Sequence, residues 1–300
     1  MKMKQYGGQA ALILCAIIWG TAFVAQSTGM RHLGPCGFNA ARSFLAGVVM
    51  LPCIIILDCI RGRRPTWWGG ATTALARRML LRGGILCGLA LAAASLVQQI
   101  GIKYTTVTKA GFITTLYIIL VPLFGLLLGR RTRRLTWLCA GMSVAGMYLL
   151  CCAGESGIAS GDLLLLLCAA LFACQILVID HFVPHVDCVR LSCLQFLVVG
   201  VVSLAMAALL GEPLSPDALS GAAFEIFYCG VLSSGVAYTL QIIGQKYVHP
   251  VAASLLMSTE SVFAALSGWL ILRQPLTPVE LAGCVIIFTA VVIAQIPGRG

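Results

Sequence analysis

Ten long apolar runs follow one another along this chain, and they decide what it can fold into. Each run covers roughly 17–25 residues with few charges, the length that a helix needs to cross a hydrocarbon core of about 30 Å. The alternating pattern of a membrane β-barrel is absent. The sequence therefore predicts an all-α integral membrane protein with ten transmembrane helices. The predicted spans are Ala10–Gly29, Cys36–Leu57, Gly83–Ile102, Ala110–Gly129, Leu135–Ala153, Leu163–Ile179, Leu191–Leu210, Ala222–Ile243, Val251–Leu272 and Thr277–Ile296.

Composition agrees with this prediction. Charged residues make up 10% of the chain and mean hydropathy is +0.98. Soluble domains carry about 25% charged residues, so this chain cannot cover a large water-facing surface. The first apolar run, of about 20 residues, exceeds the 7–15 residues of a signal-peptide core. We therefore expect it to be retained as a helix.

Lysine and arginine gather in alternate loops. With the N-terminus inside, 15 of the 20 basic residues lie on inner segments and four on outer ones, while Arg42 lies within the second span. Cytoplasmic loops carry such an excess of basic residues. The pattern predicts that both termini are cytoplasmic in a cell (inner) membrane. Because these residues belong to no soluble domain, a nucleic-acid partner is not expected.

The sequence also repeats itself. QQIGIKY (98–104) returns as QIIGQKY (241–247) at an offset of 143 residues, and an offset of 153 aligns Arg42 with Gln195. The chain is therefore predicted to hold two five-helix repeats, residues 8–153 and residues 161–296. Because five is odd, the second repeat enters the membrane from the opposite side. Such inverted repeats are typical of secondary transporters, whose substrate site lies between the halves near the membrane midplane.

Four stretches resemble the EamA-type members of the drug/metabolite transporter superfamily. They are WGTAFVAQ (19–26), NAARSFLAG (39–47), KAGFITTLYIILVPLFGLLLGRR (109–131) and ESVFAALSGWLILRQPLTPVELAG (260–283). The resemblance implies ten helices around a central cavity, with the fifth and tenth at the periphery. It also implies export of amino acids or other metabolites, without catalytic chemistry. Arg273-Gln274 stand where many relatives have Gly-Glu, so no role of that acid is carried over.

Polar residues deep in the apolar runs are the candidates for the site. A charge at the bilayer centre costs about 2.5–3.5 kcal/mol on insertion scales, so Glu260 needs a reason to be there. It is either a site for a proton, a cation or a substrate ammonium, or a protonated packing residue. Tyr117 occupies the equivalent position of the first repeat and is likewise either functional or packing.

Arg42 matches the second-helix arginine of the family. With Gln195 at the equivalent position, two planar donors could hold one substrate carboxylate in turn as access alternates. This hypothesis favours amino acids or organic acids as substrates. The alternative is that the Arg42 side chain extends past Asn39 to the membrane interface. Further candidates for the cavity lining are Trp19, Gln98, Gln175 and Gln241.

The sequence thus predicts a secondary transporter, an exporter of small metabolites that works by alternating access between two inverted repeats. Glu260 is a candidate for proton or cation coupling, and the expected assembly is a monomer or a weak oligomer in the lipid bilayer. No catalytic residue, cofactor or metal site is predicted, because no H-E-x-x-H, G-x-S-x-G or C-x-x-C occurs. The alternatives are an intramembrane enzyme and a non-transporting membrane protein. An enzyme would need catalytic motifs that are missing here, and a non-transporting protein would leave the inverted repeat unexplained.

Overall fold

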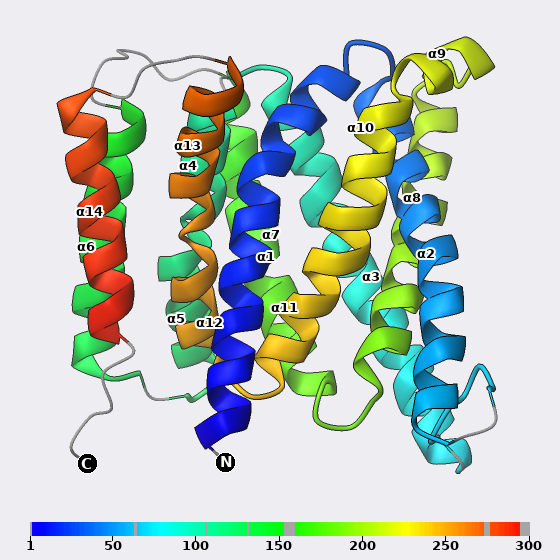
Figure 1. Cartoon of the computed structure of the whole chain (residues 1–300). Helices are drawn as coiled ribbons and strands as arrows, with labels where there is room; N and C mark the ends of the chain where they lie inside the picture. The colour runs from blue at the N-terminus through cyan, green and yellow to red at the C-terminus, as the bar shows by residue number, and fades with distance from the viewer. Residues whose placement is uncertain are drawn as a thin grey trace.

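The structure is a bundle of helices. The computed structural model describes residues 2–62, 65–71, 73–105, 107–130, 132–152, 160–272 and 277–294, and all regular structure within these ranges is helical (Figure 1). The α-helices are α1 (Lys2–Gly29), α2 (Pro35–Ile60), α3 (Ala74–Ile102), α4 (Val107–Thr115), α5 (Tyr117–Leu127), α6 (Arg134–Cys152), α7 (Ser160–Phe182), α8 (Cys188–Leu209), α9 (Pro216–Gly221), α10 (Ala223–Phe227), α11 (Tyr238–Gln245), α12 (Pro250–Met257), α13 (Glu260–Leu272) and α14 (Pro278–Ala294). A π-helical segment, η1 (Tyr228–Ala237), joins α10 to α11.

Eight helical stretches of the described residues are long and apolar enough to cross a membrane. They correspond to the first four predicted spans and to the sixth through ninth. The other two predicted spans form α6 and α14, and α14 is a shorter apolar helix of 17 residues. The chain is therefore an all-helical, multi-pass membrane protein. Two helices extend beyond the predicted spans, since α1 begins at Lys2 and α3 at Ala74. Long basic side chains at a helix end can reach water while the backbone stays helical.

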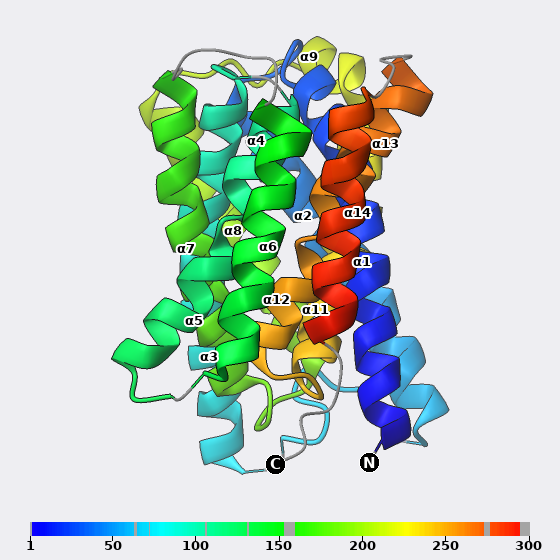
Figure 2. The same ribbon diagram turned by 90° about the vertical axis from the view of Figure 1, so that its left-hand side faces the viewer.

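Helices from the two parts of the chain pack against one another. Contacts join α2 to α8, α3 to α7, α1 to α13 and α6 to α14, and the α6–α14 pair stands at the edge of the bundle (Figures 1 and 2). Gly20 permits the α1–α13 contact, since a Cβ atom there would lie 2.6 Å from the Cβ of Phe263 and 2.7 Å from the carbonyl oxygen of Glu260. The main apolar core consequently lies between residues of both halves.

Two predicted spans are interrupted near their middle. The fourth span divides into α4 and α5 at Leu116, and the ninth into α12 and α13 at Ser258 and Thr259. Pro122, the proline of the fourth span, lies inside α5 and beyond the interruption. Hydroxyl groups bond the preceding turns instead: Thr115 donates to Phe112 O, Ser258 to Leu255 O and Thr259 to Leu256 O. Such bonds compete with the helical ladder and bend helices.

The first and last helices run in opposite directions, so α1 begins and α14 ends at the same end of the bundle (Figure 1). We call this the basic end. Arg190 at the start of α8 is buried there, paired with Asp58 near the end of α2, and its Nη2 donates to Thr66 O. At the opposite end, Glu212 accepts hydrogen bonds from the backbone amides of Cys36 and Gly37 in the first turn of α2. These contacts hold α2 and α8 together at both ends.

Candidate functional site

A small polar cavity lies inside the bundle, beside the interrupted helices and η1. Its volume is about 30 Å³. A buried water needs about 10–15 Å³ of such space, so the cavity has room for about two water molecules. The lining residues come from both halves of the chain: Trp19, Phe23, Gln26, Arg42, Gln98, Thr114, Tyr117, Phe172, Ser233, Tyr238 and Glu260.

Arg42 contributes a buried guanidinium to this cavity. The side chain projects from α2 and the residue is 4% exposed. Its Nε donates to Asn39 Oδ1 at 2.9 Å and its Nη1 to Gln26 Oε1 at 3.2 Å, while the Cys229 thiol is a further neighbour. These partners are neutral, and none of the ion pairs among the described residues involves Arg42. The cation is thus held in place by hydrogen bonds without being neutralised.

A polar network behind Arg42 fixes its position. The Asn39 amide donates to Ser95 Oγ at 3.0 Å and to Ser203 Oγ at 2.8 Å, which links α2 to α3 and α8. Asn39 and both serines are buried. Because Asn39 Oδ1 is the acceptor for Arg42 Nε, the guanidinium points into the bundle interior. This geometry differs from a side chain that extends to the membrane interface.

Glu260 and Tyr117 meet in the cavity. Tyr117 Oη donates to Glu260 Oε1 at 3.3 Å, and each residue is 3% exposed. Both occupy the first position of a half-helix, Tyr117 in α5 and Glu260 in α13. The positive end of a helix dipole and its unsatisfied amides favour negative charge. The two interruptions occur at equivalent positions of the repeats, and they therefore bring Tyr117 and Glu260 into contact.

An aromatic cluster closes another side of the cavity. The Trp19 and Tyr238 rings lie 4.6 Å apart between centroids, and Phe196 meets Tyr238 edge-on at 5.3 Å. Trp19 Nε1 donates to the carbonyl oxygen of Ser233 in η1 at 3.3 Å. A π-helix leaves backbone groups out of the regular i to i−4 ladder, and such segments are frequent at functional sites. The indole thus fixes a carbonyl that η1 exposes to the cavity.

Five of the eight residues predicted for the site line this cavity: Glu260, Arg42, Tyr117, Trp19 and Gln98. The other three lie elsewhere. The Gln241 amide donates to Gln175 Oε1 at 3.3 Å, so these two form a buried pair between α11 and α7. Gln195 is fully buried on α8, and neither of its amide atoms bonds a described residue. Its backbone carbonyl lies close to Gly88 of α3, and Gln195 is not among the residues that line the cavity with Arg42.

Further lining residues support the predicted ones. Gln26, deep in the first predicted span, supplies an acceptor for Arg42. Thr114, which was not chosen from the sequence, accepts a hydrogen bond from Gln98 Nε2 at 3.5 Å. Phe172 could have been identified from the sequence, because it aligns with Trp19 at an offset of 153 residues. Ser233 lies in η1 and Tyr238 directly after it, and the corresponding part of the first repeat belongs to the uninterrupted α3.

The cavity's chemistry is suited to binding and not to bond breaking. It holds one carboxyl group and one guanidinium, and the described residues contain no cluster of His, Cys, Asp and Glu that could hold a metal ion. Pockets for small organic ligands measure about 300–1,000 Å³, well above the 30 Å³ found here. A substrate can therefore enter only when the surrounding helices separate.

Comparisons with known proteins agree with this picture. The profile of the EamA-like transporter family matches residues 7–152 and again residues 159–295. The chain is 27% identical over 297 residues to an "Uncharacterized transporter" of Archaeoglobus fulgidus, covering 98% of this chain and 87% of that protein. It is 25% identical to the "Uncharacterized inner membrane transporter YedA" of Escherichia coli K12 over 290 residues, 94% of this chain and 89% of the relative.

The fold is also shared with a solved structure. A crystal structure superposes with a TM-score of 0.76 at 19% sequence identity, covering 96% of each chain; this likeness concerns the fold alone. The family matched is one of transporters and not of enzymes. Together with the apolar helices and the two matched stretches, this shows that the chain is a multi-pass membrane transporter belonging to the EamA-like transporter family.

Proposed function

We propose that this transporter exports small metabolites that carry a carboxylate, such as amino acids or organic acids, across an inner membrane by alternating access. The observation that carries the proposal is the buried Arg42 guanidinium, which shares a cavity with Glu260 and has no carboxylate partner among the described residues. A substrate carboxylate would supply the missing counter-charge and could accept two parallel hydrogen bonds from the planar guanidinium.

Alternating access requires two states of the same helices. In this proposal all ten predicted spans cross the membrane, and the repeats 8–153 and 161–296 are inverted with both termini cytoplasmic. The pairing of α2 with α8 and of α3 with α7 supports it, because every such contact joins one repeat to the other. The small cavity supports it as well, since a closed intermediate is expected between the inward-open and outward-open forms. The inner-membrane location follows the name of the Escherichia coli relative.

Glu260 is the proposed coupling group. It is buried with one neutral hydrogen-bond donor, Tyr117. A charge in the membrane interior is costly, so binding or release of a proton or a cation at this carboxyl group would change which helix arrangement is stable. Exchange of that ion with one side of the membrane would then drive substrate export.

The test begins with the identity of the substrate. Metabolites in the medium of overexpressing cells and of cells lacking the transporter are compared, and the compound that differs is measured in sealed proteoliposomes. We expect Arg42→Lys to weaken substrate affinity about tenfold or more, because it loses charge-assisted hydrogen bonds. Arg42→Gln should abolish transport, whereas the control Arg31→Lys, at an exposed loop position, should change nothing.

Glu260→Gln tests coupling separately. It keeps the size and hydrogen bonding of the side chain but cannot carry a charge, so transport should persist downhill without its dependence on pH or on a cation gradient. Wild-type affinity in both Arg42 variants would refute the role of Arg42 and the preference for anionic substrates. Wild-type pH and cation dependence of Glu260→Gln would make Glu260 a packing residue.

A further inference from the structure

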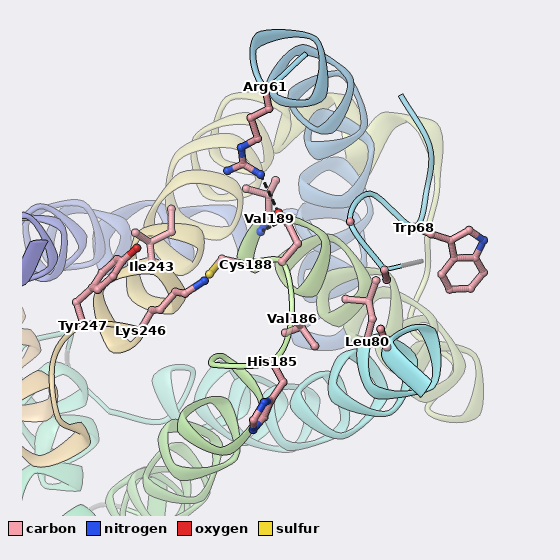
Figure 3. A pocket seen from close by; sticks show the side chains of 14 residues that line it. Arg61, Trp68, Leu80, His185, Val186, Cys188, Val189, Ile243, Lys246 and Tyr247 are labelled. Atoms are coloured by element: carbon pink, nitrogen blue, oxygen red, sulfur yellow. Dashed lines mark hydrogen bonds and ion pairs between the residues drawn. The ribbon is translucent and has the colours of Figure 1, made fainter. Parts of the chain in front are cut away.

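A second hollow lies at the basic end of the bundle, and none of its lining residues belongs to the central cavity. Its volume is about 540 Å³. The end of α2, the loop before α3, the turn between α7 and α8, and the end of α11 form its walls (Figure 3). We call it the basic pocket. It is large enough for a polar headgroup and is open to the outside of the bundle.

The pocket carries positive charge from two separate elements. Figure 3 shows Arg61, just after α2, and Lys246, just after α11, both directed into it. Lys246 is exposed and takes part in none of the ion pairs among the described residues. The Asp187 carboxylate is occupied, since it lies 3.0 Å from Arg61 Nη1 and 3.5 Å from Arg190 Nη1. The ammonium of Lys246 therefore remains available to an anion.

An apolar groove continues from the basic pocket along the membrane-facing surface. It has a volume of about 240 Å³, lies between α2 and the η1–α11 stretch, and shares Val189 and Ile243 with the basic pocket. On α2 it extends from Leu57 to Val49. At 1.5 Å per residue, the distance along α2 from Arg61 to Val49 is about 18 Å. This is close to the depth of one leaflet, about half of a 30 Å hydrocarbon core.

We propose that the basic pocket and the groove form one binding site for an anionic phospholipid. The phosphate contacts Arg61 and Lys246, and one acyl chain lies in the groove. Basic pockets between transmembrane helices on the cytoplasmic side bind anionic headgroups. A soluble phosphate compound would fill the pocket but would leave the adjoining apolar groove without an occupant. The leaflet involved is the cytoplasmic one if the orientation proposed above holds, whereas lipid binding itself does not depend on that orientation.

The site connects lipid binding to the transport cavity through η1. Gly235 and Val236 of η1 form part of the groove wall. In the same segment, Ser233 lines the cavity, and its carbonyl oxygen accepts the hydrogen bond from Trp19. An acyl chain in the groove therefore packs against the outer face of the segment whose inner face meets the cavity. Lipid occupancy then favours the helix arrangement that keeps this π-helical segment in place.

The headgroup contact is tested with two lipids that differ only in charge. Purified full-length protein in detergent is titrated with phosphatidylglycerol or phosphatidylcholine of identical chains, and bound lipid is counted by native mass spectrometry. We expect wild-type protein to prefer phosphatidylglycerol. Lys246→Gln should weaken that binding about fivefold, the contribution of one basic residue near a lipid surface. Lys103→Gln is the matched control, because Lys103 is the exposed repeat counterpart at the other end of the bundle, and it should bind like wild type.

The groove is tested independently with tryptophan. Cys53→Trp places a large ring in the groove and should reduce retention of both lipids, whereas Val48→Trp, also exposed on α2 but outside the groove, should not. Soluble glycerol 3-phosphate should fail to displace phosphatidylglycerol. Equal retention of the two lipids by wild-type protein, unchanged binding in Lys246→Gln or in Cys53→Trp, or displacement by glycerol 3-phosphate would each overturn the proposal.

Discussion

Single charged residues hold the basic end of this transporter together. Arg190 and Asp58 form an ion pair whose side chains are 2% and 0% exposed, and the backbone carbonyl of Trp67 accepts a further bond from Arg190 Nε at 2.9 Å. Gly69 gives this guanidinium its space, since a Cβ atom there would lie 2.4 Å from Arg190 Cζ, and φ at Gly69 is +54°. Removing one partner of a buried pair typically costs about 3–5 kcal/mol, because the other charge is left uncompensated.

Asp187 makes the stability of this end depend on pH. Burial raises the pKa of its carboxyl group, but the backbone amide of Arg190 and the Arg61 guanidinium outweigh that effect and hold the pKa below its ordinary value of 3.8. The ionised carboxylate therefore stabilises the folded state at pH values above 3.8, and this contribution is lost as the pH falls through the lowered pKa.

We expect Asp187→Asn to lower the melting temperature at pH 7 by about 2–4 °C, the shift that corresponds to about 1 kcal/mol in a chain of this size. The difference from wild type should shrink when the pH is taken below 3.8. Thermal unfolding in detergent between pH 7 and pH 3 measures this. Asp217→Asn, at an exposed position of α9, serves as control. A difference that stays constant with pH would assign the effect to packing instead of charge.

At the scale of elements, the interrupted helices are the part of the fold most closely tied to the site. The sequence ITTLY (113–117) spans the break between α4 and α5, and MSTE (257–260) spans the break between α12 and α13. Both contain hydroxyl residues that bond carbonyls three residues back. A proline is found near only one of the two breaks. The hydroxyl pattern is thus common to both interruptions, although the same bonds also occur inside the uninterrupted α1.

α1 and α13 cross at Gly20, and this crossing places Glu260 beside α1. We expect no side chain to fit at position 20. We expect Gly20→Ala to destabilise the protein by about 1–3 kcal/mol, because overpacking against backbone atoms outweighs the gain of about 1 kcal/mol in helix propensity. Gly141→Ala in α6 is the control, since nothing lies within 4 Å of a Cβ atom there. That variant should be neutral or slightly more stable. Equal melting temperatures for the two variants would contradict the close approach of α1 and α13.

At the scale of the whole molecule, the two matched family regions interleave instead of forming separate bodies. The most extensively packed helix pairs (α2 with α8, α3 with α7 and α8, α6 with α14, and α1 with α13) each take one member from residues 2–152 and one from residues 160–294. A movement of helices in one repeat consequently alters the packing of helices in the other. This is the property that the proposed exchange of inward-open and outward-open forms needs.

Topology is the prediction that belongs to this scale. Fusions of a reporter that is active only in the cytoplasm should give signal after Arg299 and none at Ser156, because 15 basic residues lie on inner segments and four on outer ones under the proposed orientation. Both fusion points lie outside the described residues. A C-terminal reporter found on the outer side would remove the inverted-repeat interpretation while leaving family membership untouched.

Much of this protein could be predicted from the sequence alone. Hydrophobicity summed over about 20 residues is a local property, so the membrane helices could be recognised without knowing how they pack. The duplicated motif and the stretches shared with the family are also local, and the family itself is confirmed. Glu260 and Arg42 could be chosen because an ionisable group in an apolar run is costly wherever the helix lies.

The tertiary structure decided which polar groups meet. Gln98 and Gln195 look alike in the sequence and both are buried, yet Gln98 lines the cavity and Gln195 does not. The difference depends on helix rotation, which is set by contacts between residues far apart in the chain. Ser233 lies within η1 and Tyr238 directly after it, where the backbone departs from the regular helical ladder, and both line the cavity. Hydrophobicity determines that a segment crosses the membrane, but since lipid and protein interior are equally apolar, only close packing determines which face turns inward.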